Sequence, residues 1–253
     1  MTDAAPAFKD HFSRHADAYA RYRPDYPAAL FAWLARLAPK TNRAWDCATG
    51  SGQAAAALAE HFAEVVATDA SEEQVRNARP HPRVEYRTAP AERSGLEDGS
   101  VDLITVAQAL HWFDLPAFYA EADRVLVPGG ALAVWAYELF RATPEIDAAV
   151  NRLYRDIVGP YWPPDRKVIE TGYAGIELPF ERVEAPPFWM EKRWSADDAA
   201  GYLGTWSATR RYVEANGHDP VPLIADELAA AWGPGERIVR WPLILLVSRK
   251  GGA

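Results

Sequence analysis

Arg43-Ala-Trp-Asp-Cys-Ala-Thr-Gly-Ser-Gly-Gln53 is the stretch of the sequence that decides the fold. Residues 43–47 form a short, mostly apolar run that predicts a β-strand, and five small residues, Ala48 to Gly52, follow as a turn. The alanine-rich segment from Gln53 to Phe62 then has strong helix propensity. Glycines let a ligand approach the backbone closely, and a helix N-terminus offers unpaired N–H groups. Strand, turn and helix in this order predict a site for a nucleotide-type cofactor.

A second acidic residue strengthens this prediction. Asp69 ends the apolar run that begins at Glu64, and it lies 17 residues after Gly52. A carboxylate in that place typically accepts hydrogen bonds from both hydroxyl groups of a ribose. The turn departs from the G-x-G-x-x-G fingerprint, because Ala55 stands where the third glycine could be.

Strands and helices alternate through the first half of the chain, which predicts an α/β fold with a doubly wound parallel sheet. Ligands of such sheets bind outside the carboxyl ends of the strands. Four segments of the chain converge on that edge: they contain Cys47, Asp69, residues 89–92 and residues 107–112. This convergence carries more weight than any one motif. Cys47 itself, a small residue in the first strand, is expected to be buried in the core.

The alternation stops at Tyr137. We expect one or two helices over residues 139–158, a rigid aromatic loop at 159–164, and a strand at 182–189 interrupted by two prolines. A helix from Ser195 through Arg210, a helix over 223–232 and a last strand over 238–248 complete the chain. We therefore expect a single domain. Its predicted parts are an N-terminal helical lid (1–40), a cofactor-binding core (41–136), a helical insertion (137–178) and C-terminal strands and helices that complete the sheet (179–253).

Composition limits the classes of function. The 253 residues carry 27 basic and 35 acidic side chains, a net charge of −8, which argues against nucleic acid or an anionic membrane as a partner. The single cysteine allows no internal disulfide and fits a reducing compartment. No signal pattern opens the chain, and no apolar run approaches the roughly 20 residues of a membrane span. We expect a cytoplasmic protein, monomeric or homodimeric, that acts on a small molecule.

These motifs resemble the class I S-adenosylmethionine-dependent methyltransferases of the type 11 group. The family's first motif, an acidic residue followed by G-x-G-x-G, is met by residues 46–52 with Ala48 in place of the first glycine. Residues 101–108 resemble the fourth-strand motif and residues 126–130 the L-x-P-G-G element. The resemblance implies S-adenosylmethionine as cofactor and a Rossmann-like sheet of seven strands whose last strand is antiparallel. The implied cofactor-binding residues are Asp46, Ala48, Thr49, Gly50, Gly52, Gln53, Asp69, Ala70, Ala91, Glu92 and Gln108.

Two more restricted signatures are similar to trans-aconitate methyltransferase-like proteins: residues 21–27, with the sequence RYRPDYP, and residues 111–114, with the sequence HWFD. That branch implies O-methylation of a carboxylic acid. A carboxylate is already ionised at pH 7 and needs no general base, only a cation to orient it and aromatic walls that tolerate a sulfonium. The candidate substrate-binding residues are Tyr19, Arg23, His111, Trp112, Tyr137, Trp206 and Arg210, with His111 and Tyr137 as catalytic candidates and no metal site. Ten tryptophans, concentrated after Trp112, indicate an aromatic substrate chamber or a densely packed lid.

Other functions remain open at this stage. If the acceptor is an amine or a phenol, His111 becomes the leading general base for N- or O-methylation. An NAD(P)-dependent oxidoreductase would share the strand-turn-helix unit and Asp69, but the third glycine and a Tyr-x-x-x-Lys relay are missing. A nonenzymatic module with the same fold is disfavoured by the intact Asp46, Gly50, Gly52 and Asp69. Methylation of nucleic acid is disfavoured by the charge and by residues 108–111, where an Asn/Asp-Pro-Pro-Tyr-type sequence would stand.

Overall fold

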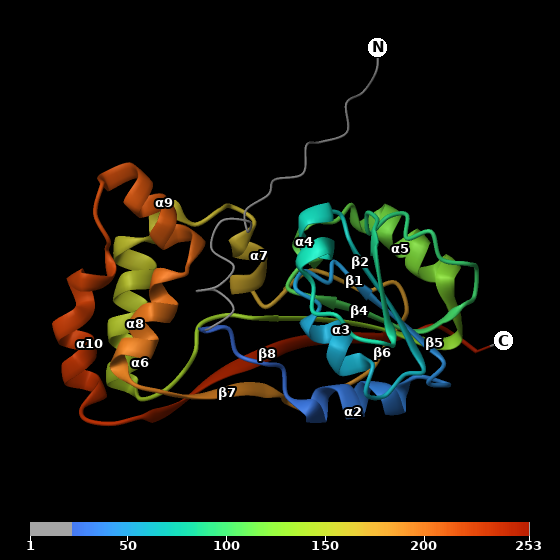
Figure 1. Ribbon diagram of the computed structural model, residues 1–253, viewed down its shortest axis with the longest axis horizontal. Helices are drawn as coiled ribbons and strands as arrows, with labels where there is room; N and C mark the ends of the chain where they lie inside the picture. Colours follow the sequence, from blue (N-terminus) through green and yellow to red (C-terminus); the bar gives the residue numbers. More distant parts are fainter. Residues whose placement is uncertain (1–21, 253) are drawn as a thin grey trace, which may run out of the picture.

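A mixed β-sheet runs through the centre of the computed structural model, which describes residues 22–252 (Figure 1). Its strands are β1 (Arg43–Cys47), β2 (Glu64–Asp69), β3 (Val84–Thr88), β4 (Val101–Ala107), β5 (Leu126–Tyr137), β6 (Glu181–Arg182), β7 (Trp189–Trp194) and β8 (Arg237–Arg249). Seven of the strands follow the order β3-β2-β1-β4-β5-β8-β6, in which β1 to β5 are parallel and β8 is antiparallel to β5. The predicted fold class is confirmed.

Helices cover both faces of the sheet. Helices α2 (Ala28–Leu37) and α3 (Gln53–Leu58) pack on one face, and α5 (Leu115–Val125) and α7 (Arg166–Glu170) pack on the other. Successive side chains of a strand point to opposite faces, so Ala44 contacts the first pair of helices and Trp45 the second. Strands β4 and β5 are buried on both faces, which explains their nearly unbroken apolar sequences. Helix α4 (Glu72–Asn77) flanks β2 and β3.

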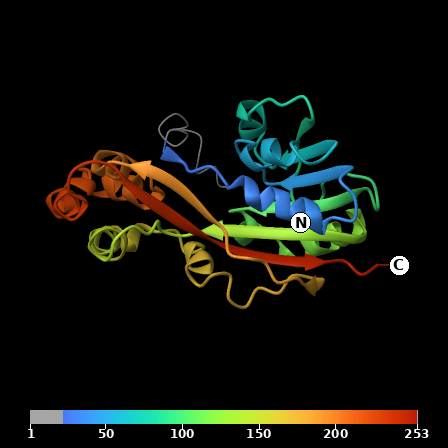
Figure 2. The ribbon, with the colours of Figure 1, turned by 90° about the horizontal axis from the view of Figure 1, so that it is seen from below.

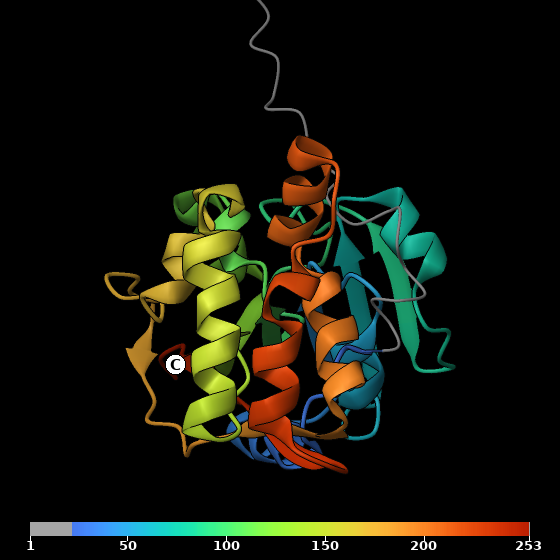
Figure 3. The same ribbon diagram turned by 90° about the vertical axis from the view of Figure 1, so that its left-hand side faces the viewer.

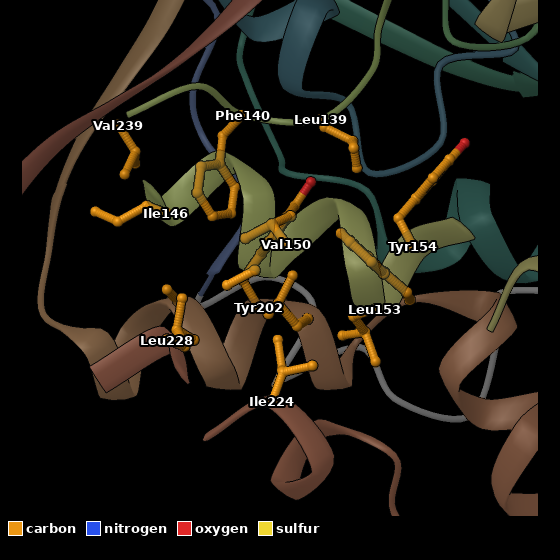
Figure 4. Packing of buried hydrophobic residues seen from close by; sticks show 14 of the residues in the cluster. Leu139, Phe140, Ile146, Val150, Leu153, Tyr154, Tyr202, Ile224, Leu228 and Val239 are labelled. Carbon is orange, nitrogen blue, oxygen red and sulfur yellow. The ribbon is translucent and has the colours of Figure 1, made fainter. Parts of the chain in front are cut away.

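The remaining helices form a lobe beyond the end of the sheet (Figures 1 and 3). They are α6 (Pro144–Asn151), the π-helix η2 (Arg152–Ile157), the short 3-10 helices η3 (Gly159–Tyr161) and η4 (Val221–Ile224), α8 (Ala196–Gly204), α9 (Ser207–Asn216) and α10 (Ala225–Trp232). Strand β8 reaches from the sheet into this helical lobe, and β7 pairs with its first half (Figure 2). Leu153, Tyr202, Leu228 and Val239 meet in the core of the lobe, which joins segments far apart in the sequence (Figure 4).

Two predicted boundaries are wrong. The strand expected over 182–189 is broken, as its two prolines predict, but the break is longer than expected, because β6 ends at Arg182 and β7 begins only at Trp189. Pro186 and Pro187 lie between them and have no N–H group to donate to a ladder. The intervening chain still runs beside β8, since Val183 N donates to Val247 O (2.9 Å).

The helix expected from Ser195 through Arg210 is also broken, and α8 and α9 are separated by Thr205 and Trp206. Residues 127–130, the core of the L-x-P-G-G element, lie within β5, where Gly129 has a φ of +79°. Residues 1–21 of the helical lid expected over 1–40 lie outside the described residues, and within the rest α2 begins directly after Pro27. The division of the chain into lid, core and insertion stays a prediction. Within residues 22–252 no helix has the length and apolar character needed to cross a membrane.

Candidate active site at the carboxyl edge of the sheet

The turn between β1 and α3 has an unusual backbone. Ala48, Gly50 and Gly52 have φ values of +54°, +55° and +76°, in the left-handed region that costs a non-glycine residue roughly 1–2 kcal/mol. A Cβ atom on Gly52 would lie 2.3 Å from the hydroxyl oxygen of Tyr86, whereas one on Gly50 would meet nothing within 4 Å. The turn is therefore tightly packed at Gly52 and open at Gly50, and Ala48 stores local strain of the kind that collects at functional sites.

The carboxylate of Asp69 lies against this turn. It accepts hydrogen bonds from the backbone N–H of Gly50 and of Ser71, each at 2.9 Å. Burial raises the pKa of Asp69 above its usual range, although the two backbone hydrogen bonds act in the opposite direction. Each carboxylate oxygen has further acceptor capacity, so the end of β2 presents an acceptor pair beside the open side of Gly50.

Asp46 is enclosed instead of facing the open side. Its carboxylate accepts hydrogen bonds from Thr49 Oγ1 (2.5 Å) and from Thr105 Oγ1 (2.7 Å), and only 1% of the residue is exposed. Burial raises its pKa to about 6, against the effect of these hydrogen bonds. Asp46 thus connects β1, β4 and the turn, and we infer that it stabilises the glycine-rich turn from its buried side. Cys47, the next residue, is buried as expected.

The segment before α2 lies over the start of α3. Gln53 Nε2 donates to the backbone oxygen of Pro24 (3.1 Å) and to Asp25 Oδ1 (2.9 Å). Arg23 Nε donates to the hydroxyl of Tyr137 at 3.2 Å. These contacts place an arginine and a tyrosine together at the carboxyl end of β5, next to the glycine-rich turn.

Gln108 connects the end of β4 to the carboxyl end of β5. Its Nε2 donates to the backbone oxygen of Tyr137 (3.1 Å), and its backbone N–H donates to the oxygen of Trp135 (2.8 Å). Gln108 has a φ of +59°, so it and Ala48 are non-glycine residues in the left-handed region at the ends of adjacent strands. Backbone strain is concentrated where the two strands open toward a ligand.

His111 follows β4 in the short helix η1 (Leu110–Trp112). Burial lowers the pKa of its imidazole to about 4. Within residues 22–252 its Nδ1 and the hydroxyl of Tyr173 are buried polar atoms without a hydrogen-bond partner, and the two rings lie 6.5 Å apart. Trp112 lies against the same imidazole at 4.6 Å and remains 49% exposed. His111 Nδ1 and the Tyr173 hydroxyl could therefore bind a ligand beside the exposed indole of Trp112.

The loops after β2 and β3 contain the remaining predicted cofactor-binding residues. Ala91 is buried, Ala70 is exposed, and Glu92 Oε1 accepts a hydrogen bond from the backbone N–H of Asp114 at 3.0 Å. This last contact joins the loop after β3 to the loop after β4. The predicted cofactor-binding residues therefore lie along one edge of the sheet.

The predicted substrate residues separate into two groups. Arg23, His111, Trp112 and Tyr137 lie at the strand ends, whereas Trp206 and Arg210 belong to the helical lobe. Trp206 is buried immediately before α9, with its ring 5.6 Å from that of Tyr154. Tyr19 lies outside the described residues.

Sequence reasoning missed Arg166. This residue begins α7, its Nε donates to the hydroxyl of Tyr154 (3.1 Å), and its guanidinium carbon lies 4.8 Å from the centre of the Trp162 ring. Its charge acts on His111 and on Glu138, which follows β5 directly. In the sequence only its position after a Trp-Pro-Pro stretch distinguishes Arg166 from a surface arginine.

A seven-stranded sheet with this order, a glycine-rich turn after β1 and an acid at the end of β2 defines a Rossmann-like fold of the methyltransferase type. Residues 45–155 match the family model described as a methyltransferase domain. A Dictyostelium discoideum protein named as a methyltransferase is 36% identical over 262 residues, which span 99% of this chain and 100% of that protein. The chain belongs to the class I S-adenosylmethionine-dependent methyltransferases.

Two further relatives agree. A solved structure from Anaeromyxobacter dehalogenans, described as a type II methyltransferase, has 47% identity and a TM-score of 0.87, and the match covers 91% of this chain and 99% of that chain. A Saccharomyces cerevisiae protein named as an S-adenosylmethionine-dependent methyltransferase is 27% identical over 63% of this chain and 60% of its own length. Family membership thus decides for S-adenosylmethionine and against the nicotinamide alternative.

The residues at the strand ends fit this cofactor. The open space at Gly50 allows close approach to the backbone, and the Asp69 carboxylate beside it suits a pair of ribose hydroxyls. Trp112 and Tyr137 supply aromatic faces that a sulfonium tolerates.

Proposed function

We propose that this methyltransferase transfers the methyl group of S-adenosylmethionine to a carboxylate oxygen of a small organic acid. This is the activity implied by its resemblance to trans-aconitate methyltransferase-like proteins. The observation that carries the proposal is the hydrogen bond from Arg23 Nε to the hydroxyl of Tyr137. It holds a guanidinium, the group best suited to bind a carboxylate, at the carboxyl end of β5 beside the glycine-rich turn.

The state of His111 favours a carboxylate over an amine or a phenol. Those acceptors need a base to remove a proton, and a base works best when its pKa lies near the working pH. Burial lowers the pKa of His111 to about 4, so its imidazole is neutral but weakly basic at pH 7. A carboxylate acceptor is already ionised at that pH and does not require this step.

The bound cofactor would supply an electrophilic methyl group on a sulfonium with a good leaving group. The work of the chain is then to hold the acceptor oxygen in line and to exclude water. Gly50 and Asp69 would hold the cofactor, Arg23 would orient the acceptor, and Trp112 and Tyr137 would form aromatic walls around it.

The nature of the product tests this proposal. The protein is incubated with S-adenosylmethionine labelled in the methyl group and with a panel of organic acids, amines and phenols. We expect a labelled methyl ester, which mild alkali cleaves to labelled methanol, whereas N-methyl and aryl O-methyl products survive the same treatment.

Two substitutions and one control sharpen the test. Arg23→Met should raise the KM for the acid at least about tenfold, the effect of losing roughly 1.4 kcal/mol of binding, whereas Arg36→Met, at an exposed position in α2, should leave it unchanged. His111→Asn should retain turnover of the acid. An alkali-stable product whose formation requires His111 would instead establish the amine or phenol acceptor.

A further inference from the structure

Arg166 is held in place by aromatic side chains. Its guanidinium carbon lies 4.8 Å from the ring centre of Trp162 and 5.7 Å from that of Tyr154, and its Nε donates to the Tyr154 hydroxyl at 3.1 Å. Tyr154 donates its own hydroxyl proton to Glu170, one turn further along α7. These contacts fix the guanidinium without using its two terminal nitrogens.

The aromatic support is itself rigid. Trp162 Nε1 donates to the backbone oxygen of Tyr154 (3.2 Å), and the two rings lie 4.9 Å apart. Both rings also contact the ring of Trp206, each at 5.6 Å, and Trp206 and Tyr154 are buried. A guanidinium ordered in this way has already lost the side-chain freedom that binding would otherwise cost.

The charge of Arg166 is not neutralised by an ion pair. Over residues 22–252 no carboxylate lies within 4 Å of its nitrogens, and its terminal nitrogens donate no hydrogen bond there. Two neighbouring arginines differ in this respect, because Arg141 pairs with Asp147 at 4.0 Å and Arg152 pairs with Glu227 at 2.9 Å.

Helix α7 lies beside the candidate active site, because Tyr173, three residues after the helix, has its ring 6.5 Å from that of His111. The charge of Arg166 acts in addition on His111 at the end of β4, on Glu138 after β5 and on Tyr202 in α8. Figure 1 shows α7 between the helical lobe and the carboxyl edge of the sheet. An acceptor in front of His111 and Tyr137 would therefore be within the influence of Arg166.

We propose that Arg166 binds an anionic group of the methyl acceptor and thereby selects acids over neutral molecules of the same shape. The terminal nitrogens of a guanidinium form a planar pair of donors that matches the two oxygens of a carboxylate. The proposal rests on the proposed function for the location of the acceptor, and it assigns specificity to a residue outside the family's sequence motifs described above.

Binding of acids and of their amides tests this role. The full chain is saturated with S-adenosylhomocysteine, the unreactive product of the cofactor, and titrated calorimetrically with benzoate, succinate, benzamide and succinamide. We expect at least one acid to bind better than its amide. Arg166→Met should weaken binding of that acid at least about tenfold and leave its amide and S-adenosylhomocysteine unaffected. Arg166→Lys, which keeps the charge but not the planar fork, should give an intermediate loss.

Arg193→Met, at an exposed position in β7, is the matched control and should change nothing. Equal binding of acids and amides by the wild-type protein would overturn the proposal, and so would undiminished acid binding by a folded Arg166→Met variant. Equal losses for acid and amide would show that Arg166 acts only in packing. If S-adenosylhomocysteine itself does not bind, the proposed function fails; if it binds and only the Arg166 effect is missing, this inference alone fails.

Discussion

At the scale of single residues, the burial of His111 has a measurable consequence for stability. Its imidazole has a pKa of about 4 in the folded protein, compared with 6.5 for the unperturbed group. As the pH falls below 6.5 the unfolded chain takes up a proton at this position and the folded protein does not. His111 therefore lowers the free energy of unfolding progressively between pH 6.5 and pH 4.

Substitution of His111 should remove this penalty. Between pH 7.5 and pH 5 the wild-type protein should lose about 2 kcal/mol more stability than His111→Asn, because 1.5 pH units below 6.5 correspond to that much free energy. Asp46, whose pKa is raised to about 6, acts in the opposite direction, but it is present in both proteins and cancels in the comparison. Urea unfolding at the two pH values measures the difference. Equal losses would contradict the burial of a neutral imidazole.

The sequence predicts residues well where a motif fixes the backbone. Asp69 and Gly50 were expected at one site, and the structure joins them by a hydrogen bond of 2.9 Å. Arg166 was missed because α7 reaches the end of β4 by packing against the sheet, where Tyr173 and His111 lie together, and no local pattern encodes this packing of segments more than fifty residues apart. Whether the individual site residues bind as we expect stays a prediction.

At the scale of elements, the turn between β1 and α3 has two glycines with different tasks. Both have positive φ, but only Gly52 is packed against a neighbour, the hydroxyl of Tyr86. Gly52→Ala should therefore destabilise the protein by roughly 2 kcal/mol or more, since it adds a steric conflict to the backbone strain of about 1 kcal/mol. Gly50→Ala should cost only the strain.

The substitutions Gly50→Ala and Gly52→Ala should also separate an effect on protein stability from an effect on cofactor binding. The space in front of Gly50 is where the cofactor would approach, so Gly50→Ala should weaken binding of S-adenosylmethionine despite its smaller effect on folding. Thermal unfolding and calorimetric titration of both variants measure the two effects. Equal destabilisation by the two substitutions would contradict the packing of the turn as described.

The sequence predicts a helix boundary correctly where a local capping group sets it, and less well where tertiary packing sets it. Ser195 accepts a hydrogen bond from Asp198 N (3.2 Å) and caps α8, so this helix begins where the sequence predicts it. The break between α8 and α9 follows Gly204, the last residue of α8, although Thr205 and Trp206 themselves are neither proline nor glycine. Trp206 is instead buried against Tyr154, so the tertiary contact determines where α9 begins.

At the scale of the whole molecule, the long strand β8 unites the sheet and the helical lobe. Its second half pairs with β5 and its first half with β7, and Trp241 in the first half is fully buried in the lobe. Several of the tryptophans after Trp112 are core residues, including Trp135 in the sheet and Trp232 and Trp241 in the lobe. Composition alone does not distinguish a packed lobe from an aromatic chamber, whereas the structure places Trp112 against His111 and Trp162 against Arg166.

The central claim is that the carboxyl edge of this sheet binds S-adenosylmethionine through Asp69. Calorimetric titration with S-adenosylmethionine, NADH and NADPH tests it on the wild-type protein, on Asp69→Ala and on Asp102→Ala. Asp102 is the matched control because it too is buried and accepts two backbone N–H groups, from Asn42 (3.0 Å), just before β1, and from Arg43 (3.1 Å), its first residue.

We predict that S-adenosylmethionine alone binds, that Asp69→Ala weakens its binding at least about tenfold, or roughly 1.4 kcal/mol, and that Asp102→Ala does not. Binding of NADH in its place, or equal affinity of the two variants for S-adenosylmethionine, would contradict the account.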